Sequence, residues 1–268
     1  MPRMSHERSA HYGREELADE LLAVLEHAFG VDLNEADLRG VDQFHLGGHV
    51  AIEALLDGLT LDGGATVLDV GCGIGGVARA IASRFRCAVT AIDLTPEYVR
   101  AARALSDRVG AGTGISFEVA DALSIPYPDD GFNASIVVHV GMNISDKAAL
   151  VDELHRVTKP GGYLAIYDIV RLTDAPLTYP LPWTADVATD HIDHADTYVA
   201  ALAASGLTIQ HQIDRTTLVL EAIQRNASDP PPVNLGHLMG PEWPTMFGNL
   251  RAALNAGVVA PVEIVAHT

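Results

Sequence analysis

The sequence predicts an α/β fold in which a mostly parallel sheet is covered by helices on both faces. Three observations predict it. Short β-branched runs alternate with helical stretches from residue 65 onward, a glycine-rich turn joins the first run to the first of these helices, and the residues before them carry apolar side chains at helical spacing.

The first 60 residues are expected to be mainly helical. Residues 1–12 are polar and predict a loose tail, while apolar residues recur at helical spacing between Arg14 and Phe29. The segment from Asp42 to His49 is expected to open a second helix, which covers 50–59.

The middle of the chain has the βα alternation of a parallel sheet. The expected turn at 159–162 is the Lys-Pro-Gly-Gly sequence. Ser145 or Asp146 is a suitable cap for the third helix of this segment. The expected strands are 65–69, 88–92, 115–119, 134–138 and 163–168, and the expected helices are 74–85, 96–108 and 145–157.

The last third is less regular. A Pro- and Thr-rich stretch at 172–190 predicts a loop, and Asp229-Pro230-Pro231-Pro232 breaks the chain again. Between and after these breaks we expect helices at 197–204, 216–227 and 244–256, and strands at 207–213 and 258–266.

Composition limits the function classes. The 268 residues carry a net charge of -18, which repels phosphate backbones and anionic membranes, so nucleic acid is not an expected partner. No apolar run approaches the roughly 18 residues that span a bilayer. The polar N-terminus lacks the apolar core of a signal peptide, and two cysteines make no disulfide framework, so we expect a cytoplasmic protein with buried thiols at Cys72 and Cys87.

The strongest local signal is the turn VLDVGCGIGG at 67–76. Glycines there let the backbone approach a ligand, and the following helix offers free N–H groups. The spacing of Gly71, Gly73 and Gly76 also fits a nicotinamide dinucleotide fold. Asp69 argues against that reading, because a carboxylate there would repel a pyrophosphate but suits a cationic amino group.

Further motifs follow the later strands in a fixed order: AIDLT (91–95), VADALSIPYPDDGF (119–132), VVHVGMNISD (137–146) and HRVTKPGGYLAIYD (155–168). Together with the glycine turn, this set resembles the class I S-adenosylmethionine (SAM)-dependent methyltransferases, in particular those similar to the ubiquinone/menaquinone-biosynthesis and sarcosine/dimethylglycine-type enzymes. Asn133 departs from the Asp that relatives usually carry after Gly-Phe, but this position begins a strand.

The resemblance implies a Rossmann-like seven-stranded sheet with an antiparallel last strand. It implies an N-terminal helical lid at 1–60, a SAM-binding core at 61–268, and a helical cap insertion at about 214–256 before the last strand. Ligands in such folds bind outside the carboxyl ends of the strands, where the insertion would lie.

The resemblance also assigns the cofactor side of the site. Asp69 takes the amino group of SAM, Asp93 takes the ribose hydroxyls, and Leu94 packs on the adenine. The remaining cofactor residues that we expect to contact SAM, or its product S-adenosylhomocysteine (SAH), are Gly71, Gly73, Gly75, Asp121, Ala122, His139, Gln43 and Gly48.

The acceptor side is predicted from the lid and the later strand ends. His45 is the first choice for a general base or acceptor hydrogen bond, and His139 is the second; each is also explained as an ordinary packed or helix-start residue. The other expected acceptor contacts are Met142, Asn143, Tyr167, Asp168 and Trp183. The His- and Asp-rich segment 190–196 matches no specific metal-ligand spacing, so no metal site is predicted.

We therefore expect methyl transfer to the O, N or C atom of a small molecule, such as a quinol, phenol or polyketide-like ring. Three alternatives stay open at this point: methylation of a small amine such as a glycine derivative, a non-catalytic SAM- or SAH-binding protein, and a nicotinamide-dependent oxidoreductase. A homodimer is compatible with the sequence, which carries no visible signal of oligomeric state.

Overall fold

The computed structural model describes residues 16–268, so the predicted loose tail (1–12) and the start of the first predicted helix lie outside the described residues. Within 16–268, seven strands form one sheet in the order β3-β2-β1-β4-β5-β7-β6. Strand β7 runs antiparallel to both β5 and β6, and the other pairs are parallel. The strands are β1 (Thr66–Val70), β2 (Ala88–Asp93), β3 (Ile115–Val119), β4 (Phe132–Val138), β5 (Thr158–Arg171), β6 (Thr208–Asp214) and β7 (Val259–His267).

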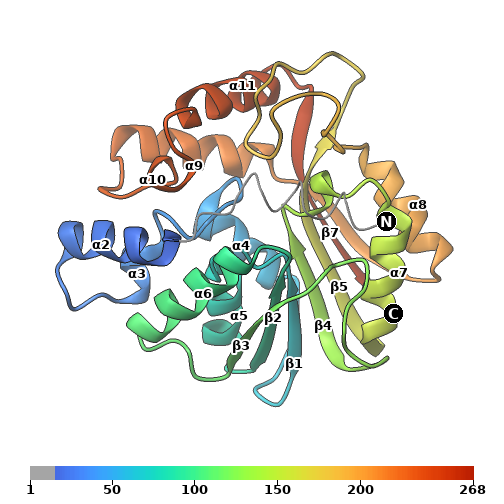
Figure 1. Ribbon diagram of the computed structural model, residues 1–268. Coiled ribbons are helices and arrows are strands. Elements are labelled where there is room, and N and C mark those ends of the chain that lie inside the picture. Colours follow the sequence, from blue (N-terminus) through green and yellow to red (C-terminus); the bar gives the residue numbers. More distant parts are fainter. Residues whose placement is uncertain (1–15) are drawn as a thin grey trace.

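The predicted fold class is confirmed, including the antiparallel last strand beside the strand predicted at 207–213. Helices cover both faces of the sheet (Figure 1). The helical segments are α2 (Leu17–Phe29), α3 (Glu35–Leu38), α4 (Gly48–Leu56), α5 (Gly76–Phe85), α6 (Pro96–Arg108), α7 (Lys147–Val157), α8 (Ala195–Ala204), α9 (Thr216–Ser228), α10 (Gly236–Met239), α11 (Trp243–Asn255) and the short 3-10 turn η1 (Gly141–Asn143).

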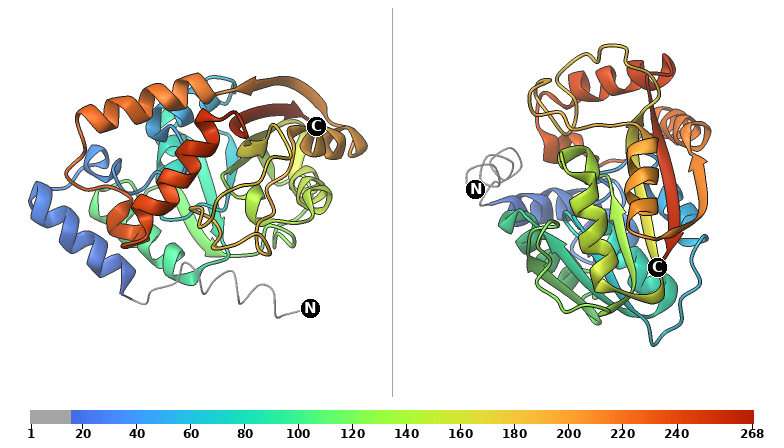
Figure 2. Two further views of the ribbon diagram at one scale, coloured as in Figure 1. Left: turned by 90° about the horizontal axis from the view of Figure 1, so that it is seen from above. Right: turned by 90° about the vertical axis from the view of Figure 1, so that its right-hand side faces the viewer.

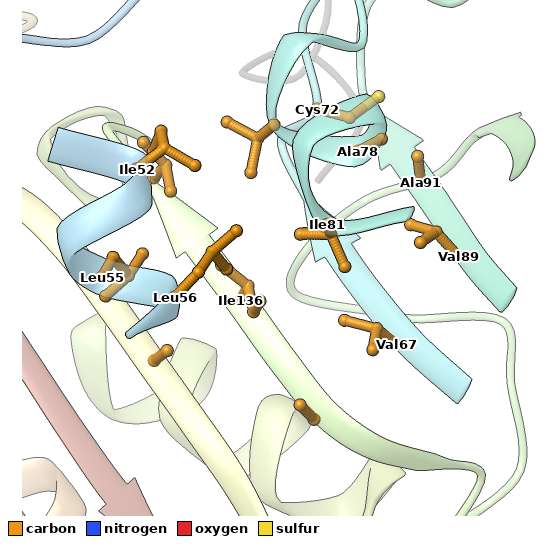
Figure 3. Close-up of a cluster of buried hydrophobic side chains, with 14 of the residues drawn as sticks. Ile52, Leu55, Leu56, Val67, Cys72, Ala78, Ile81, Val89, Ala91 and Ile136 are labelled. Atoms are coloured by element: carbon orange, nitrogen blue, oxygen red, sulfur yellow. The ribbon is translucent and has the colours of Figure 1, made fainter. Parts of the chain in front are cut away.

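Alternation along the strands divides the core into two layers. On one face, Ile52 and Leu55 of α4 and Ile81 of α5 pack with Val67 and Ile136 of the sheet (Figure 3). The neighbouring strand residues point the other way and pack with α7 and α8. Helix α4 is therefore part of the main core, which fixes the position of the loop that precedes it.

The insertion lies at the top of the molecule in Figure 1, where α9, α10 and α11 are drawn, and the view from above shows α11 crossing in front of the strands (Figure 2). Its Val233 and Leu238 pack with Leu21 of α2 and Leu38 of α3 in one buried cluster. We call the insertion 214–256 and the lid loop 42–48 together the roof.

Several boundaries differ from the prediction. The expected turn at 159–162 belongs to β5, because Gly161 N–H and Gly162 N–H donate to Thr268 and continue the pairing with the end of the chain. Helix α5 begins two residues later than expected, because Gly75 precedes it in the left-handed conformation (φ +86°). Helices α3 and α10 were not predicted, since four residues are too few for a periodic pattern.

No helix within residues 16–268 has the length and apolar character needed to cross a bilayer.

Candidate cofactor and acceptor site

One cavity of about 1300 Å³ lies at the carboxyl ends of β1, β2, β3 and β4, beneath the roof. The structure brings most of the predicted site residues together on its wall, although they come from distant parts of the sequence. The predicted residues that line it are Gln43, His45, Gly48, Gly71, Gly73, Asp93, Leu94, Asp121, Ala122, His139, Met142, Asn143 and Trp183.

The glycine loop is held by the end of β2. The Gly73 N–H donates to Oδ2 of Asp93 at 2.9 Å, and the Thr95 N–H donates to Oδ1 at 2.8 Å. Gly73 has φ +53°, and a Cβ at Gly71 would lie 2.1 Å from Cγ2 of Val140, so both positions require glycine. The loop and the carboxylate therefore form one preorganised unit.

Burial raises the pKa of Asp93, while hydrogen bonds from the backbone of Thr95 and Gly73 act in the opposite direction. The Thr95 hydroxyl and the Leu94 backbone lower this pKa as well, so several donors face the Asp93 carboxylate. The Asp121 carboxylate likewise accepts one bond, from the Leu123 N–H at 2.9 Å. Both carboxylates line the cavity, at the ends of neighbouring strands.

Asp69 and Gly75 do not line the cavity, and the contacts of these two residues with SAM stay predictions. Asp69 points to the sheet face that α5 covers, is 1% exposed, and its Oδ2 has no hydrogen-bond partner within the described residues. Burial, reinforced by the charge of Asp93, raises its pKa to about 8. Gly75 lies against Arg79 and Phe117, where a Cβ would approach each to within 2.9 Å.

Contacts with helix α5 attach the lid loop to the core. Oδ2 of Asp42 accepts a hydrogen bond from Nη2 of Arg79 at 2.9 Å, and both side chains are buried. A Cβ at Gly76 would lie 2.1 Å from the Asp42 carbonyl oxygen, so the loop backbone touches the start of α5. Nε2 of Gln43 donates to Oδ1 of Asp42, which turns the Gln43 side chain toward this anchor.

His45 and His139 lie close together in the cavity wall, with ring centroids 5.9 Å apart. Neither ring nitrogen of His45, nor Nε2 of His139, has a hydrogen-bond partner within residues 16–268. Burial lowers the pKa of His45 to about 4 and lowers that of His139 well below its usual value. Both imidazoles are therefore neutral at pH 7 and add no positive charge beside a sulfonium.

Tyr167 and Asp168 do not reach the cavity, which corrects a pair of expected contacts. Being adjacent on β5, they point to opposite faces of the sheet. The Tyr167 hydroxyl donates to the Leu46 carbonyl at 3.0 Å and supports the lid loop from beneath. The Asp168 carboxylate accepts from the Tyr198 hydroxyl in the other layer, and burial raises its pKa to about 6.

Trp183 forms a fixed aromatic part of the wall. Its indole N–H donates to Oδ1 of Asp190 at 3.0 Å, and the Tyr179 hydroxyl donates to Oδ2 at 2.6 Å. Asp190 thus serves as an acceptor for side chains of the loop at 172–190. Within the described part of the chain, no group of three or more His, Cys, Asp or Glu side chains is arranged to hold a metal ion.

Sequence reasoning did not assign several wall residues to the site. Ile169 follows the predicted pair on β5, and the insertion supplies several more. On α11 the signal was available: four wall residues recur at i, i+4, i+7 and i+8, which places them on one helical face. The insertion residues in question are Ile223, Arg225, Leu250 and Arg251.

Residues 68–166 match the family model described as "Methyltransferase domain". The chain is 41% identical over 109 residues to a 2-methyl-6-phytyl-1,4-hydroquinone methyltransferase from Synechocystis sp., covering 41% of this chain and 33% of that protein. It is 32% identical over 183 residues to a phosphoethanolamine N-methyltransferase from Triticum aestivum, covering 68% of this chain and 36% of that protein. Over the first curated relatives, the match spans from about a third to two thirds of the relative's length.

Among solved structures, the chain is similar to a geranyl diphosphate C-methyltransferase from Streptomyces coelicolor A3(2), which was determined with SAH. The two superpose with a TM-score of 0.71 at 15% identity, and the match covers 99% of this chain and 98% of that one. The chain therefore carries a methyltransferase domain of the class I SAM-dependent type. SAM is the cofactor of this class, as the sequence predicts.

Proposed function

We propose that this chain transfers a methyl group from SAM to a small-molecule acceptor bound beneath the roof. The observation that carries the proposal is the single cavity that contains both the expected cofactor residues and the expected acceptor residues. At about 1300 Å³ it exceeds the roughly 300–1,000 Å³ of a typical ligand pocket, so it has room for two molecules side by side.

The residues of the cofactor half fit SAM. Gly71 and Gly73 provide backbone that a ligand can approach closely, Asp93 and Asp121 place carboxylates on the cavity wall, and Leu94 and Ala122 offer apolar contacts. The unpartnered Oδ2 of Asp69 lies beneath this loop, where a cationic amino group would compensate it directly or through water. When bound, SAM supplies a methyl group that its sulfonium has already activated.

The chain's own contribution to such a transfer is positioning and exclusion of water. The lid loop holds His45 over the cavity, and the Tyr167 hydroxyl fixes the neighbouring Leu46 carbonyl. Where the acceptor is a hydroxyl or a protonated amine, a ring nitrogen of His45 accepts its proton, and His139 lies beside it as the second possible base. An acceptor whose reacting atom already carries a free lone pair, as an anion or as a neutral amine, needs neither histidine as a base.

The acceptor half favours a partly apolar acceptor such as a quinol, a phenol or a polyketide-like ring. Its wall includes Leu46, Met142, Ile169, Trp183 and Phe247, and the similarity to a hydroquinone methyltransferase points the same way. A small amine is the alternative that the similarity to a phosphoethanolamine N-methyltransferase supports. An aromatic wall suits the ring better, because it buries apolar surface.

The first test is isothermal titration of the protein with SAH, with NADH as the control ligand. We expect SAH to bind, NADH not to bind, and Asp93→Ala to weaken SAH binding about 50-fold, since hydrogen bonds to a charged group contribute about 1.5–3 kcal/mol. Asp93→Asn separates loss of the charge from loss of the loop, and Asp62→Ala, at an exposed turn, is the matched control.

Binding of NADH in place of SAH would overturn the proposal. If SAH binds, a screen of phenols, quinols and amines with methyl-labelled SAM follows. His45→Gln should then lower the transfer rate and leave the SAH affinity unchanged. Tight SAH binding without transfer to any acceptor class would instead support the non-catalytic alternative.

A further inference from the structure

Arginines without a partner gather at the cavity. The chain has 35 acidic and 17 basic residues, so an arginine generally has carboxylates within reach. Within residues 16–268, most guanidinium groups are hydrogen-bonded to a carboxylate or a carbonyl. Among those described residues, four have no such bond: Arg39, Arg86, Arg225 and Arg251. All of these except Arg86 line the cavity.

Two of them belong to the apolar underside of the insertion. On α9, Arg225 accompanies Ala222 and Ile223, and on α11, Arg251 accompanies Phe247 and Leu250. Spacings of three residues from Ala222 to Arg225 and of four residues from Phe247 to Arg251 place each arginine on the same helical face as one apolar residue of the wall. The face that the insertion turns toward the acceptor therefore combines an apolar surface with two exposed cations.

The acids of the cavity wall do not neutralise these cations. Asp93 and Asp121 belong to the cofactor half, the Asp37 carboxylate accepts from the Asn34 N–H, and the Asp186 carboxylate accepts from the Ala188 N–H. Asp229 also lines the cavity, but among the ion pairs of residues 16–268 none joins it to Arg225 or Arg251. Helices α9 and α11 contribute no acid to the wall.

We propose that the acceptor is an amphipathic anion, whose apolar body lies against Trp183, Phe247 and Leu250 and whose oxyanion group is bound by Arg225 and Arg251. This inference rests on the proposed function, because it places the acceptor under the insertion. The planar guanidinium suits the two oxygens of a carboxylate, phosphate or sulfonate. The chain carries a net charge of -18 and repels anions at a distance. The unpaired arginines attract an anion locally, at the cavity wall.

Two fluorescent probes with the same aromatic skeleton test it: anilinonaphthalene sulfonate, which is anionic, and N-phenylnaphthylamine, which is neutral. Both are titrated into the full chain saturated with SAH. We expect the double variant Arg225→Gln/Arg251→Gln to bind the sulfonate about fivefold to tenfold more weakly, since exposed charge pairs are individually modest. Binding of the neutral probe should stay within about twofold. Added salt should weaken sulfonate binding in the wild type more than in the double variant.

Arg86→Gln is the matched control, because Arg86 is also unpaired but lies at the end of α5 and does not line the cavity. It should change neither titration. Equal weakening of both probes by the double variant would show that the arginines support the roof, and unchanged sulfonate binding would show that they bind no anion; either result overturns the inference. SAH affinity, measured on the same samples, reports failure of the proposed function separately.

Discussion

The cofactor half of the cavity is built from residues that directly follow strand ends, whereas the acceptor half is built from segments near opposite ends of the chain. In the cofactor half, one carboxylate, that of Asp93, orders both the glycine loop and the start of the next helix through backbone N–H groups. Strand register fixes these positions, because β1, β2 and β4 are neighbours in the sheet. The half is therefore rigid before any ligand binds.

The acceptor half depends on contacts between the lid loop, the N-terminal helices and the insertion. A Cβ at Gly40 would lie 1.9 Å from the Val233 carbonyl oxygen, so the two backbones touch. The buried Asp42–Arg79 pair then connects the lid loop to the core. Loss of a single tertiary contact should therefore disturb the acceptor half far more than the cofactor half.

The largest effect is expected from Asp42→Asn, which breaks the anchor of the lid loop. It leaves the Arg79 guanidinium, 3% exposed, without its anionic partner, and such a loss typically costs about 3–5 kcal/mol. We expect the free energy of unfolding to fall by about that amount in chemical denaturation. Amide exchange should accelerate first in residues 41–48.

The matched control is Asp57→Asn, which removes a similar ion pair with Arg84 at the surface. Surface pairs contribute about 0–1 kcal/mol, so this change should be small. If Asp42→Asn and Asp57→Asn lower the free energy of unfolding equally, the buried Asp42–Arg79 pair has no special role in holding the lid loop. The proposed difference between the acceptor half and the cofactor half would then be wrong.

The sequence predicted the cofactor half more completely than the acceptor half, for physical reasons. Asp93 ends β2 and Asp121 follows β3, strands whose type and order are local patterns, and parallel strands bring such ends to one edge. The contact of Gly40 with Val233 has no local pattern, because it depends on how the insertion packs. Tyr167 and Asp168 were assigned together although adjacent strand residues point to opposite faces, so the period of the strand already argued against the pair.

Within the cofactor half, the buried carboxyl of Asp69 makes stability depend on pH. Because its pKa in the folded chain is raised to about 8, the folded state keeps its proton between about pH 4 and pH 8 while the unfolded state releases it. Stability therefore falls as pH rises through this range. Asp69→Asn lacks this dependence and should exceed the wild type in stability by several kcal/mol at pH 8 and by little near pH 4.

Urea denaturation across this pH range, with and without saturating SAM, measures the effect. If Asp69 serves the amino group of SAM, bound SAM favours the ionised carboxylate and should flatten the pH dependence of the wild type. A slope that SAM leaves unchanged would show that Asp69 has only a structural role beneath the glycine loop. Asp62→Asn, at an exposed turn, controls for general effects of removing a charge.

The smallest effect concerns Trp183 in the acceptor half. Asp190→Ala removes the acceptor of both the Trp183 indole and the Tyr179 hydroxyl, each bond contributing about 1–1.5 kcal/mol. We expect binding of the neutral probe N-phenylnaphthylamine to weaken about tenfold and indole fluorescence to shift to the red as the ring gains water. SAH affinity should stay unchanged, because Asp190 bonds only within its own loop.

Asp190→Asn keeps one acceptor oxygen and should be intermediate, while Asp196→Ala, exposed on α8, should match the wild type. Should Asp190→Ala weaken SAH as much as the probe, the two halves are coupled through this loop, and the separation argued from their construction would not hold.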